Sequence, residues 1–360
     1  MFRPVAPVKD LLSGKSEHLY AAPDGGLWLL TDQGAVRFSP DGTGPVVSTA
    51  GVGAPVGVDA AGRIWAVGED QAAISAWDGA AWTRYGTEAG WTPLDEAESW
   101  YRYVGWGQGD AAGRFWLPTS ADVRFFDGAR WTAFTPAEMG MEEDEERDLI
   151  LDLVLTIPES TGQVWVGACL WSGPGPFGGW GARWFDGRTW RGAESPVASG
   201  CVNRIVEDAN GRIWLGADTD LWRYDPSSED WTQFAPPEEP PFGFLRFGSI
   251  TTLALPPSGE AWVAFLLCGG ASCDTEAFYR LRDGVWDLVM EEPLIGRHTL
   301  AFDPSGDPWL FAEAVYRIRE DGIEMIAPLY AQSAAVDSAG QIWFTAWYRG
   351  QNRLWTLDWE

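Results

Sequence analysis

Short apolar runs alternate with polar turn signals along the whole chain, and one of these turn signals recurs. Its form is Asp-x-x-Gly-x-x-Trp, and the copy from Asp208 to Trp214 lies between two apolar runs. Aspartate at the first position of a turn accepts backbone N–H groups, and glycine at the fourth position takes a positive φ, as a type I turn prefers. The pattern therefore predicts a tight hairpin turn that leads into a strand beginning near the tryptophan.

The Gly-x-x-Trp half of this motif occurs eight times along the chain. The copies are Gly25/Trp28, Gly62/Trp65, Gly113/Trp116, Gly162/Trp165, Gly211/Trp214, Gly259/Trp262, Gly306/Trp309 and Gly340/Trp343. Five copies carry the full motif, which adds Asp59, Asp110, Asp208, Asp303 and Asp337. Successive tryptophans are 34 to 51 residues apart, and an eighth of the 360 residues is 45. A period of this length is typical of the blades of a β-propeller.

Each repeat reads as four short strands, and the fifth repeat shows them best. Its strands are expected at Cys201–Glu207, Arg212–Ala217, Leu221–Tyr224 and Trp231–Phe234, which are rich in aromatic and β-branched residues. The third strand often ends in Asp-Gly, a strong hairpin signal. We therefore expect an all-β fold, an eight-bladed β-propeller of four-stranded antiparallel blades that forms a single domain over residues 1–360. Seven blades is the alternative.

The last repeat has only three strands, the third of which is expected at residues 352–357. The N-terminal stretch Arg3–Val8 precedes the first expected inner strand, His18–Ala22, and is available to supply the fourth. Its two prolines suit an edge position, where a missing N–H group is tolerated. We expect the N-terminal strand to close the ring by completing the eighth blade, which leaves no long edge open.

Composition and charge narrow the classes of partner. Apolar residues make up 46% of the chain and charged residues 21%, and no run of about 18 apolar residues is present, so we expect a soluble protein without membrane insertion. Acidic residues outnumber basic ones by 52 to 25, and the formal net charge of −27 repels phosphate backbones. Nucleic acid is therefore not expected as a partner. The acidic surface opposes edge-to-edge association of sheets, and a cation site is the alternative interpretation.

The four cysteines, Cys169, Cys201, Cys268 and Cys273, do not have the paired spacing of zinc ligands, so we predict no metal site and no cofactor. Cys268 and Cys273 are close enough to form a small disulfide loop in an oxidising compartment, and reduced cysteines packed as small apolar side chains are the alternative. The N-terminus lacks the apolar stretch of a secretory signal. The chain as written is expected in the cytoplasm, or in the periplasm or outside the cell if it was trimmed.

The pattern Asp-x-x-Gly-x-Ile/Leu-Trp-x-Gly, followed by Leu-x-Arg-Tyr-Asp and Trp-Thr-x-Phe, resembles the two-component regulator propeller repeat. The best copy is Asp208–Phe234, with Asp59–Tyr85 and Asp110–Phe134 close to it, and the resemblance covers nearly the whole chain. Propellers of this family are usually sensory ectodomains of membrane-bound hybrid histidine kinases, often responding to glycan fragments. Because this sequence has no transmembrane helix and no kinase or receiver segment, the resemblance implies only the fold and a binding role.

A second family that the chain resembles is the virginiamycin B lyase type of propeller, which uses a histidine and acidic residues with magnesium. The only histidines here are His18 and His298, and neither belongs to a recognisable catalytic group. No Ser/His/Asp or Cys/His set can be assigned, so we predict no catalytic residues. A lyase or hydrolase acting on a polysaccharide or a related small molecule, with acids and His298, remains the alternative to a non-enzymatic binding function.

The long and variable segments of the repeats fall in two classes of connection. They are the links between blades at residues 86–109, 135–148, 235–248 and 290–296, and the loops between second and third strands at residues 169–181 and 266–275. In an antiparallel four-stranded blade these two classes lie on the same face of the propeller. Since binding residues concentrate on loops held by a rigid scaffold, we expect the working surface on this face.

Aromatic and basic side chains in these segments are the candidate ligand-binding residues. Tryptophans can stack on sugar rings or apolar side chains, and guanidinium groups near the start of inner strands can grip carboxylates. The alternatives are that the aromatic residues form small cores under their own loops and that the arginines pair with nearby acids. The predicted ligand is a carboxylate-bearing glycan, an acidic peptide or a protein partner, as for a sensor-like module or scaffold. The candidates are Arg102, Trp106, Arg147, Trp171, Trp180, Arg204, Arg246, Arg297 and His298.

Overall fold

The computed structural model describes most of the chain, in ranges separated by short gaps. These are residues 2–5, 17–21, 26–31, 33–39, 42–68, 70–93, 104–141, 150–172, 175–241, 243, 245–256, 258–269, 272–290, 294–295, 298–319, 322–337, 339–348 and 351–357. Over these ranges the structure has 33 β-strands and one short 3-10 helix, Thr87–Ala89. None of the helices found in these ranges is long and apolar enough to span a membrane.

The chain divides into two compact units. The first comprises Met1–Val58, Gly62–Arg84 and Ile295–Glu360, and the second comprises Asp59–Ala61 and Tyr85–Leu294. Each is built from four-stranded antiparallel groups, which we call blades and number in chain order. Whether residues 1–360 form a single domain stays a prediction.

The first unit holds four blades. Their strands are β2 (Glu17–Ala21), β3 (Leu27–Thr31), β4 (Gly34–Ser39) and β5 (Gly42–Ser48) in blade 1; β6 (Ala54–Val58), β7 (Ile64–Val67), β8 (Ile74–Trp77) and β9 (Trp82–Tyr85) in blade 2; β27 (Thr299–Phe302), β28 (Pro308–Phe311), β29 (Val315–Arg319) and β30 (Gly322–Ala327) in blade 7; and β31 (Tyr330–Val336), β32 (Ile342–Tyr348), β33 (Gln351–Leu357) and β1 (Phe2–Pro4) in blade 8.

The second unit holds the other four blades. Their strands are β10 (Gly107–Gly109), β11 (Phe115–Pro118), β12 (Val123–Phe126) and β13 (Trp131–Phe134) in blade 3; β14 (Ile150–Thr156), β15 (Val164–Ser172), β16 (Gly175–Phe185) and β17 (Trp190–Arg191) in blade 4; β18 (Val202–Glu207), β19 (Ile213–Ala217), β20 (Asp220–Asp225) and β21 (Asp230–Phe234) in blade 5; and β22 (Arg246–Ala254), β23 (Ala261–Gly269), β24 (Ser272–Arg282) and β25 (Val285–Leu288) in blade 6, where β26 (Leu294–Ile295) also pairs with β24.

The described strands confirm the predicted fold class. The chain is an all-β protein with eight four-stranded antiparallel blades, the organisation of an eight-bladed β-propeller. Each of the eight Gly-x-x-Trp tryptophans lies in the second strand of its own blade, from Trp28 in β3 to Trp343 in β32. The strand bounds expected for the fifth repeat differ from the observed ones by one residue or fewer at each end. Local turn chemistry therefore determines where each blade begins its second strand.

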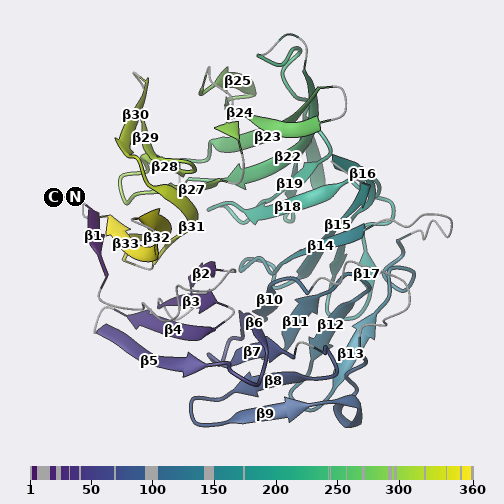
Figure 1. The fold of residues 1–360 in the computed structure, drawn as a ribbon. Coiled ribbons are helices and arrows are strands. Elements are labelled where there is room, and N and C mark those ends of the chain that lie inside the picture. The colour runs from purple at the N-terminus through teal and green to yellow at the C-terminus, as the bar shows by residue number, and fades with distance from the viewer. Residues whose placement is uncertain are drawn as a thin grey trace. The chain divides into compact units, whose positions relative to one another are not determined.

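The N-terminal strand completes blade 8, as predicted. β1 runs antiparallel to β33, with Phe2 opposite Leu357 and Pro4 opposite Trp355, and the two strands lie side by side in Figure 1. The N–H group of Val5 also donates to the carbonyl of Leu354 at 3.0 Å. The ring of Phe2 packs edge-on against Phe344, with the ring centroids 5.5 Å apart. Pro4 occupies a strand that has a neighbour on one side only.

Deleting residues 1–9 is expected to lower the free energy of unfolding by about 2–3 kcal/mol. The deletion removes three ladder positions and the partly buried ring of Phe2, and it exposes the edge of β33. Denaturant unfolding followed by tryptophan fluorescence measures the change. A deletion variant with the same midpoint as the parent would show that β1 contributes nothing to blade 8.

The aspartate of the repeated motif has a second role besides the turn. At Asp208, Oδ1 accepts the N–H groups of Asn210 and Arg212, and the backbone N–H of Gly211 donates to the Asp208 carbonyl at 2.9 Å. The other carboxylate oxygen, Oδ2, accepts the indole N–H of Trp214 at 2.9 Å and the Nε of Arg212 at 2.7 Å. The same indole bond is made by the tryptophans six residues after three further aspartates, in Asp110/Trp116, Asp303/Trp309 and Asp337/Trp343. The motif needs seven residues because the carboxylate holds the turn and the indole together.

The motif tryptophans also form the contacts between successive blades within each unit. Trp214 of β19 packs into a cluster with Ile250 and Val263 of the following blade, and the clusters around other motif tryptophans repeat this arrangement. In the second unit they are Trp116 with Leu153 and Trp165 with Leu215, and in the first unit Trp309 with Phe344 and Trp343 with Leu19. Burial of a large aromatic side chain contributes about 2–3 kcal/mol, so the same residue fixes the turn and joins the blades.

Candidate functional site

Two hairpins of the second unit are longer than their counterparts in neighbouring blades. β15 and β16 of blade 4 have 9 and 11 residues, and β23 and β24 of blade 6 have the same lengths. The corresponding strands of blade 5, β19 and β20, have only 5 and 6. The segments expected to be loops, 169–181 and 266–275, are therefore largely extended arms of these hairpins. They lie where second and third strands connect, on the face predicted to be the working surface.

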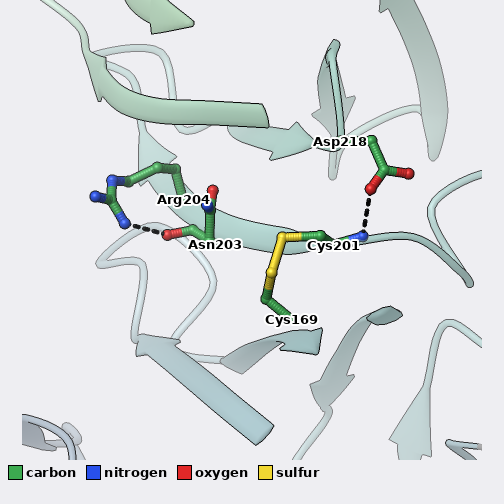
Figure 2. Close-up of a disulfide and its surroundings, with 5 residues drawn as sticks. All are labelled: Cys169, Cys201, Asn203, Arg204 and Asp218. Carbon is green, nitrogen blue, oxygen red and sulfur yellow. Dashed lines mark hydrogen bonds between the residues drawn. A yellow bond between two sulfur atoms is a disulfide. The ribbon is translucent and has the colours of Figure 1, made fainter. Parts of the chain in front are cut away.

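Both long hairpins carry a disulfide. Cys169, in the β15 arm, is bonded to Cys201, which directly precedes β18 of the next blade (Figure 2). Cys268 of β23 is bonded to its cross-strand partner Cys273 of β24. The disulfide considered for Cys268 and Cys273 is thus present, and the second disulfide is one that the sequence did not indicate. Cys169 and Cys201 are fully buried, so this disulfide belongs to the interior that supports the face.

Asp218 joins the first strands of blades 5 and 6. It lies in the turn after β19 with a φ of 50°. Its Oδ1 accepts the N–H of Cys201 at 2.8 Å, which Figure 2 shows, and its own N–H donates to the Cys201 carbonyl at 2.8 Å. The Asp218 carbonyl accepts the N–H of Ile250 in β22 at 2.9 Å. One turn residue therefore holds the start of β18 against β22.

A buried arginine organises the base of the β16 arm. Arg183 donates from Nη1 to the carbonyls of Trp180 at 3.3 Å and Ala198 at 3.2 Å, and from Nη2 to the carbonyl of Gly140 at 2.7 Å. Trp180 belongs to the β16 arm, Ala198 to the link before blade 5 and Gly140 to the link before blade 4. Hydrogen bonds from a charged donor are stronger than neutral ones, so Arg183 fixes three segments of the face at once. It was not a sequence candidate, because it lies inside a strand.

The structure brings three of the predicted site residues into this region. Arg204 is exposed on β18 and donates from Nη1 to the Asn203 carbonyl at 2.6 Å. Arg246 is exposed at the first position of β22, opposite Cys268. Trp180 is half-buried, packs against the apolar cluster of blade 4 and forms a backbone bridge with Gly200.

The other candidates are placed as follows. Trp106 is half-buried just before β10, and His298, in the first unit, is half-buried just before β27. Trp171 lies in β15 opposite Ile150. Arg102, Arg147 and Arg297 lie outside the described residues. The alternative of small aromatic cores holds for Trp91, an aromatic of the 86–109 link, which is fully buried at the edge of Trp131 with the ring centroids 5.2 Å apart.

One exposed aromatic pair of the first unit was not among the candidates predicted from the sequence. Tyr330 of β31 and Trp347 of β32 lie directly opposite each other, and half of each side chain is exposed. They are at the end of blade 8 where the link and the second-to-third turn meet. The connections there are short, whereas the predicted site residues all come from long connecting segments or lie beside them. Exposed aromatic residues at strand ends are the signal that would have found them.

The environment of His18 changes its titration. Burial lowers the pKa of His18, in β2, to about 4. The unfolded side chain has a pKa near 6.5, so the unfolded chain binds more protons between these values and protonation opposes folding.

No group of three or more His, Cys, Asp or Glu side chains within the described ranges is arranged to hold a metal ion.

His18 is therefore expected to make the protein less stable as the pH falls. The contribution is fully present above pH 6.5, and up to about 3 kcal/mol is lost on going down to pH 4. Urea unfolding of the parent and of His18→Gln at several pH values isolates the contribution of His18 to the unfolding free energy, because all other titrating groups are common to both proteins. The difference in unfolding free energy between the two proteins should change between pH 6.5 and 4 and be constant above pH 7. A constant difference over the whole range would contradict the assignment.

Comparison with known proteins adds a family match within this site. Residues 196–219 match the family model described as two component regulator propeller. This segment therefore resembles one two-component regulator propeller repeat. The repeat runs from the link before blade 5 through β18 and β19 to the turn of Asp218, so it contains Cys201, Arg204 and Trp214. The predicted resemblance is confirmed on the segment that forms one half of the site.

No curated protein matches the chain at the level of sequence. Among solved structures, a streptogramin B lyase is similar at 10% identity with a TM-score of 0.49, covering 99% of this chain and 98% of that one. YCF48 from Cyanidioschyzon merolae is similar at 9% identity with a TM-score of 0.45, covering 99% and 98%. The extracellular domain of a putative one-component system from B. thetaiotaomicron is similar at 12% identity with a TM-score of 0.40, covering 96% of this chain and 52% of that one. The chain thus spans about half the length of this last protein.

Proposed function

We propose that this protein is a non-enzymatic binding propeller that recognises a carboxylate-bearing ligand at the start of β18 and β22. The observation that supports it is the placement of Arg204 and Arg246, two exposed guanidinium groups at the start of neighbouring first strands. Guanidinium groups bind carboxylates through two parallel hydrogen bonds, which gives both affinity and orientation. Half-buried Trp180 on the adjacent arm offers an aromatic surface beside them.

Several other arginines of the second unit form ion pairs within their own blades. Arg114 and Arg212 are bound to motif aspartates, and Arg124, Arg191 and Arg280 to acids of their own blades. Nη1 of Arg204 donates to the carbonyl of the preceding residue, Asn203. The residue is exposed, as suits contact with a ligand.

Covalent and hydrogen-bonded cross-links hold the strands that carry Arg204 and Arg246. Both disulfides and a turn residue support the two arginines. Cys201, which is bonded to Cys169 and donates its N–H to Asp218, is three residues before Arg204. Cys268, which is bonded to Cys273, lies directly opposite Arg246. Side chains on an ordered scaffold lose less conformational entropy when they bind, which raises affinity. The proposed ligand is a carboxylate-bearing oligosaccharide or an acidic peptide segment. Because the chain carries −27, a ligand of low total charge is favoured over a polyanion.

A charge-matched pair of variants tests this function. Arg204→Gln/Arg246→Gln is expected to weaken binding to acidic members of a glycan and peptide array by about tenfold or more, since two charge-assisted contacts are lost. The control is Arg130→Gln/Arg188→Gln, which makes the same change of charge on exposed arginines of the third-to-fourth-strand turns, at the other ends of the strands. The control should bind like the parent.

Two results would contradict the proposal. Equal loss in both double variants would show that only overall charge matters. An array on which the parent binds nothing acidic would remove the function itself. Turnover of an array member that depends on a divalent cation would instead support the lyase alternative.

A further inference from the structure

Two β-bulges separate the end of blade 6 from the rest of the blade. In β22, Gly248 and Ser249 stand opposite a single residue of β23, and in β24 the extra residue is Asp274. Blade 5 differs, because β18 has a bulge at Asn203 while β19 and β20 keep one register. A bulge disrupts the ladder, so the residues beyond it are less firmly coupled to the sheet. Beyond both bulges lie Arg246 of β22, Cys268–Gly269 of β23 and Ser272–Cys273 of β24, which we call the tip of blade 6.

The apolar packing of blade 6 ends below the tip. Ile250 and Phe265 are fully buried in the cluster of this blade, and Phe247 packs on Phe265 with the ring centroids 4.9 Å apart. Among the described side chains, those of the tip do not belong to this cluster. The cross-strand pairs of the tip are Arg246 with Cys268, Cys268 with Cys273 and Gly269 with Ser272. The disulfide is therefore the strongest link between β23 and β24 in the tip.

The two disulfides of the protein differ in their access to solvent. Cys268 and Cys273 are half-buried, whereas Cys169 is 0% exposed and Cys201 is 1% exposed. A disulfide is reduced when a thiolate attacks one of its sulfur atoms, and the rate depends on access to that atom. A reductant should therefore reach the Cys268–Cys273 disulfide first and leave the Cys169–Cys201 disulfide in place.

The sulfur of Cys268 also contacts the first strand of the blade. A Cβ atom on Gly248 would lie 2.8 Å from this sulfur, so Sγ packs directly on the bulge of β22. Arg246 lies two residues before Gly248 and directly opposite Cys268. Because breaking the disulfide frees this sulfur to move, the redox state of the disulfide is coupled to the bulge and to the exposed residue Arg246.

We propose that the Cys268–Cys273 disulfide is a redox switch for the tip of blade 6. In the oxidised form the tip is ordered and Arg246 is held in register. In the reduced form the few ladder pairs beyond the bulges open readily, and Arg246 loses its fixed position. An ordered side chain loses less conformational entropy on binding, so reduction weakens the binding of a ligand. The effect on the ligand rests on the proposed function, and the change in order does not.

A dithiol supplies the two electrons that the switch needs. Its thiolate forms a bond to one of the two cysteine sulfurs while the Cys268–Cys273 bond breaks, and the departing thiolate takes up a proton. The second thiol of the reductant then attacks the mixed disulfide and releases the other cysteine as a thiol. The cysteine pair is reduced by two electrons and gains the two protons of the dithiol, which becomes a disulfide.

Labelling and hydrogen exchange test the switch on the full chain without a ligand. After treatment with dithiothreitol under native conditions and then with iodoacetamide, Cys268 and Cys273 are expected to be labelled at least tenfold faster than Cys169 and Cys201. After this reduction the backbone amides of the tip should exchange at least tenfold faster, while those of β18 and β19 in blade 5 keep their rates. Equal labelling of both disulfides, or unchanged exchange in the tip, would overturn the proposal.

The variant Cys268→Ser/Cys273→Ser reproduces the reduced state without a reductant. Its tip should exchange like the tip of the reduced parent, and dithiothreitol should cause no further change there. Exchange at the rate of the oxidised parent would mean that the disulfide does not control the order of the tip, and the switch would be rejected.

The acidic array members that bind the parent measure the control of binding. Reduction of the parent and the double serine variant are each expected to weaken binding by about threefold or more, and reoxidation of the parent should restore it. Unchanged affinity in a tip that exchanges faster would reject the control of binding and leave the proposed function standing. If the oxidised parent binds no acidic member, the proposed function is rejected, while labelling and exchange still decide whether the tip responds to reduction.

Discussion

Replacing Asp208 with alanine is expected to lower the free energy of unfolding by about 3–5 kcal/mol, the range for breaking a buried, charge-assisted network. The residue is 6% exposed, and its carboxylate accepts two backbone N–H groups, the indole N–H of Trp214 and the Nε–H of Arg212. Alanine leaves the indole donor buried without an acceptor and removes the anchor of the turn. Urea unfolding, compared at an unchanged m value, measures the loss.

The matched control is Asp230→Ala, an exposed aspartate of the same blade, which should change stability by about 0.5 kcal/mol or less. Asp208→Asn keeps an acceptor and should fall between the two. If Asp208→Ala costs no more than the control, the motif aspartate acts in the turn only as a favourable local residue, and the bond to the indole contributes nothing.

The same network makes Asp208 sensitive to acid. Burial on its own would raise the pKa of this carboxyl, but the hydrogen bonds from Trp214, from the backbone N–H groups of Arg212 and Asn210 and from the Arg212 guanidinium more than offset it, and the pKa is lowered. A carboxyl whose folded pKa is below its unfolded value stabilises the protein above the unfolded pKa and loses that contribution as the pH falls through the folded one. The advantage of the parent over Asp208→Asn should therefore shrink below about pH 4.

Removing the Cys169–Cys201 disulfide by replacing both residues with alanine is expected to lower the free energy of unfolding by about 4 kcal/mol. The bond closes a stretch of 32 residues, and a cross-link of that span restricts the unfolded chain by about this amount. The Cys268–Cys273 disulfide spans only 5 residues, so its double alanine variant should lose about 2 kcal/mol.

Denaturant midpoints of the two double variants test this order under oxidising conditions. The parent treated with a reducing agent in denaturant should refold to a stability below either variant. If the short-span variant loses as much as the long-span one, strain or packing in the folded state, and not chain entropy, determines what these disulfides contribute.

The blades could be predicted from sequence because their signals are local. The turn at Asp208–Gly211 and the strand starting near Trp214 depend on neighbouring residues only, and all eight tryptophans lie in the strands expected for them. The pairing of β1 with β33 was also accessible, because a missing strand at one end and a spare stretch at the other are both visible in the repeat pattern.

The details of the site depend on contacts between segments and could not be read from local signals. Cys169 and Cys201 meet because two successive blades pack side by side, and nothing in their spacing indicates a pair. Segments 169–181 and 266–275 were expected to be loops, but pairing between β15 and β16 and between β23 and β24 extends the strands through most of them. The bulges at Asn203 and Ser249 are properties of strand register, which appears only when two strands are aligned.

The pairing of β1 with β33 has a consequence for how the protein is made. Phe2 leaves the ribosome before all eight blades have been synthesised, and its partner Leu357 follows more than 350 residues later. Seven blades can assemble in turn as their strands emerge, whereas the eighth must wait for the rest of the chain. During synthesis the unpaired N-terminal segment is therefore available to proteases and to other nascent chains. Completion of blade 8 follows the assembly of the other seven blades and requires contact between residues far apart in sequence, which slows it.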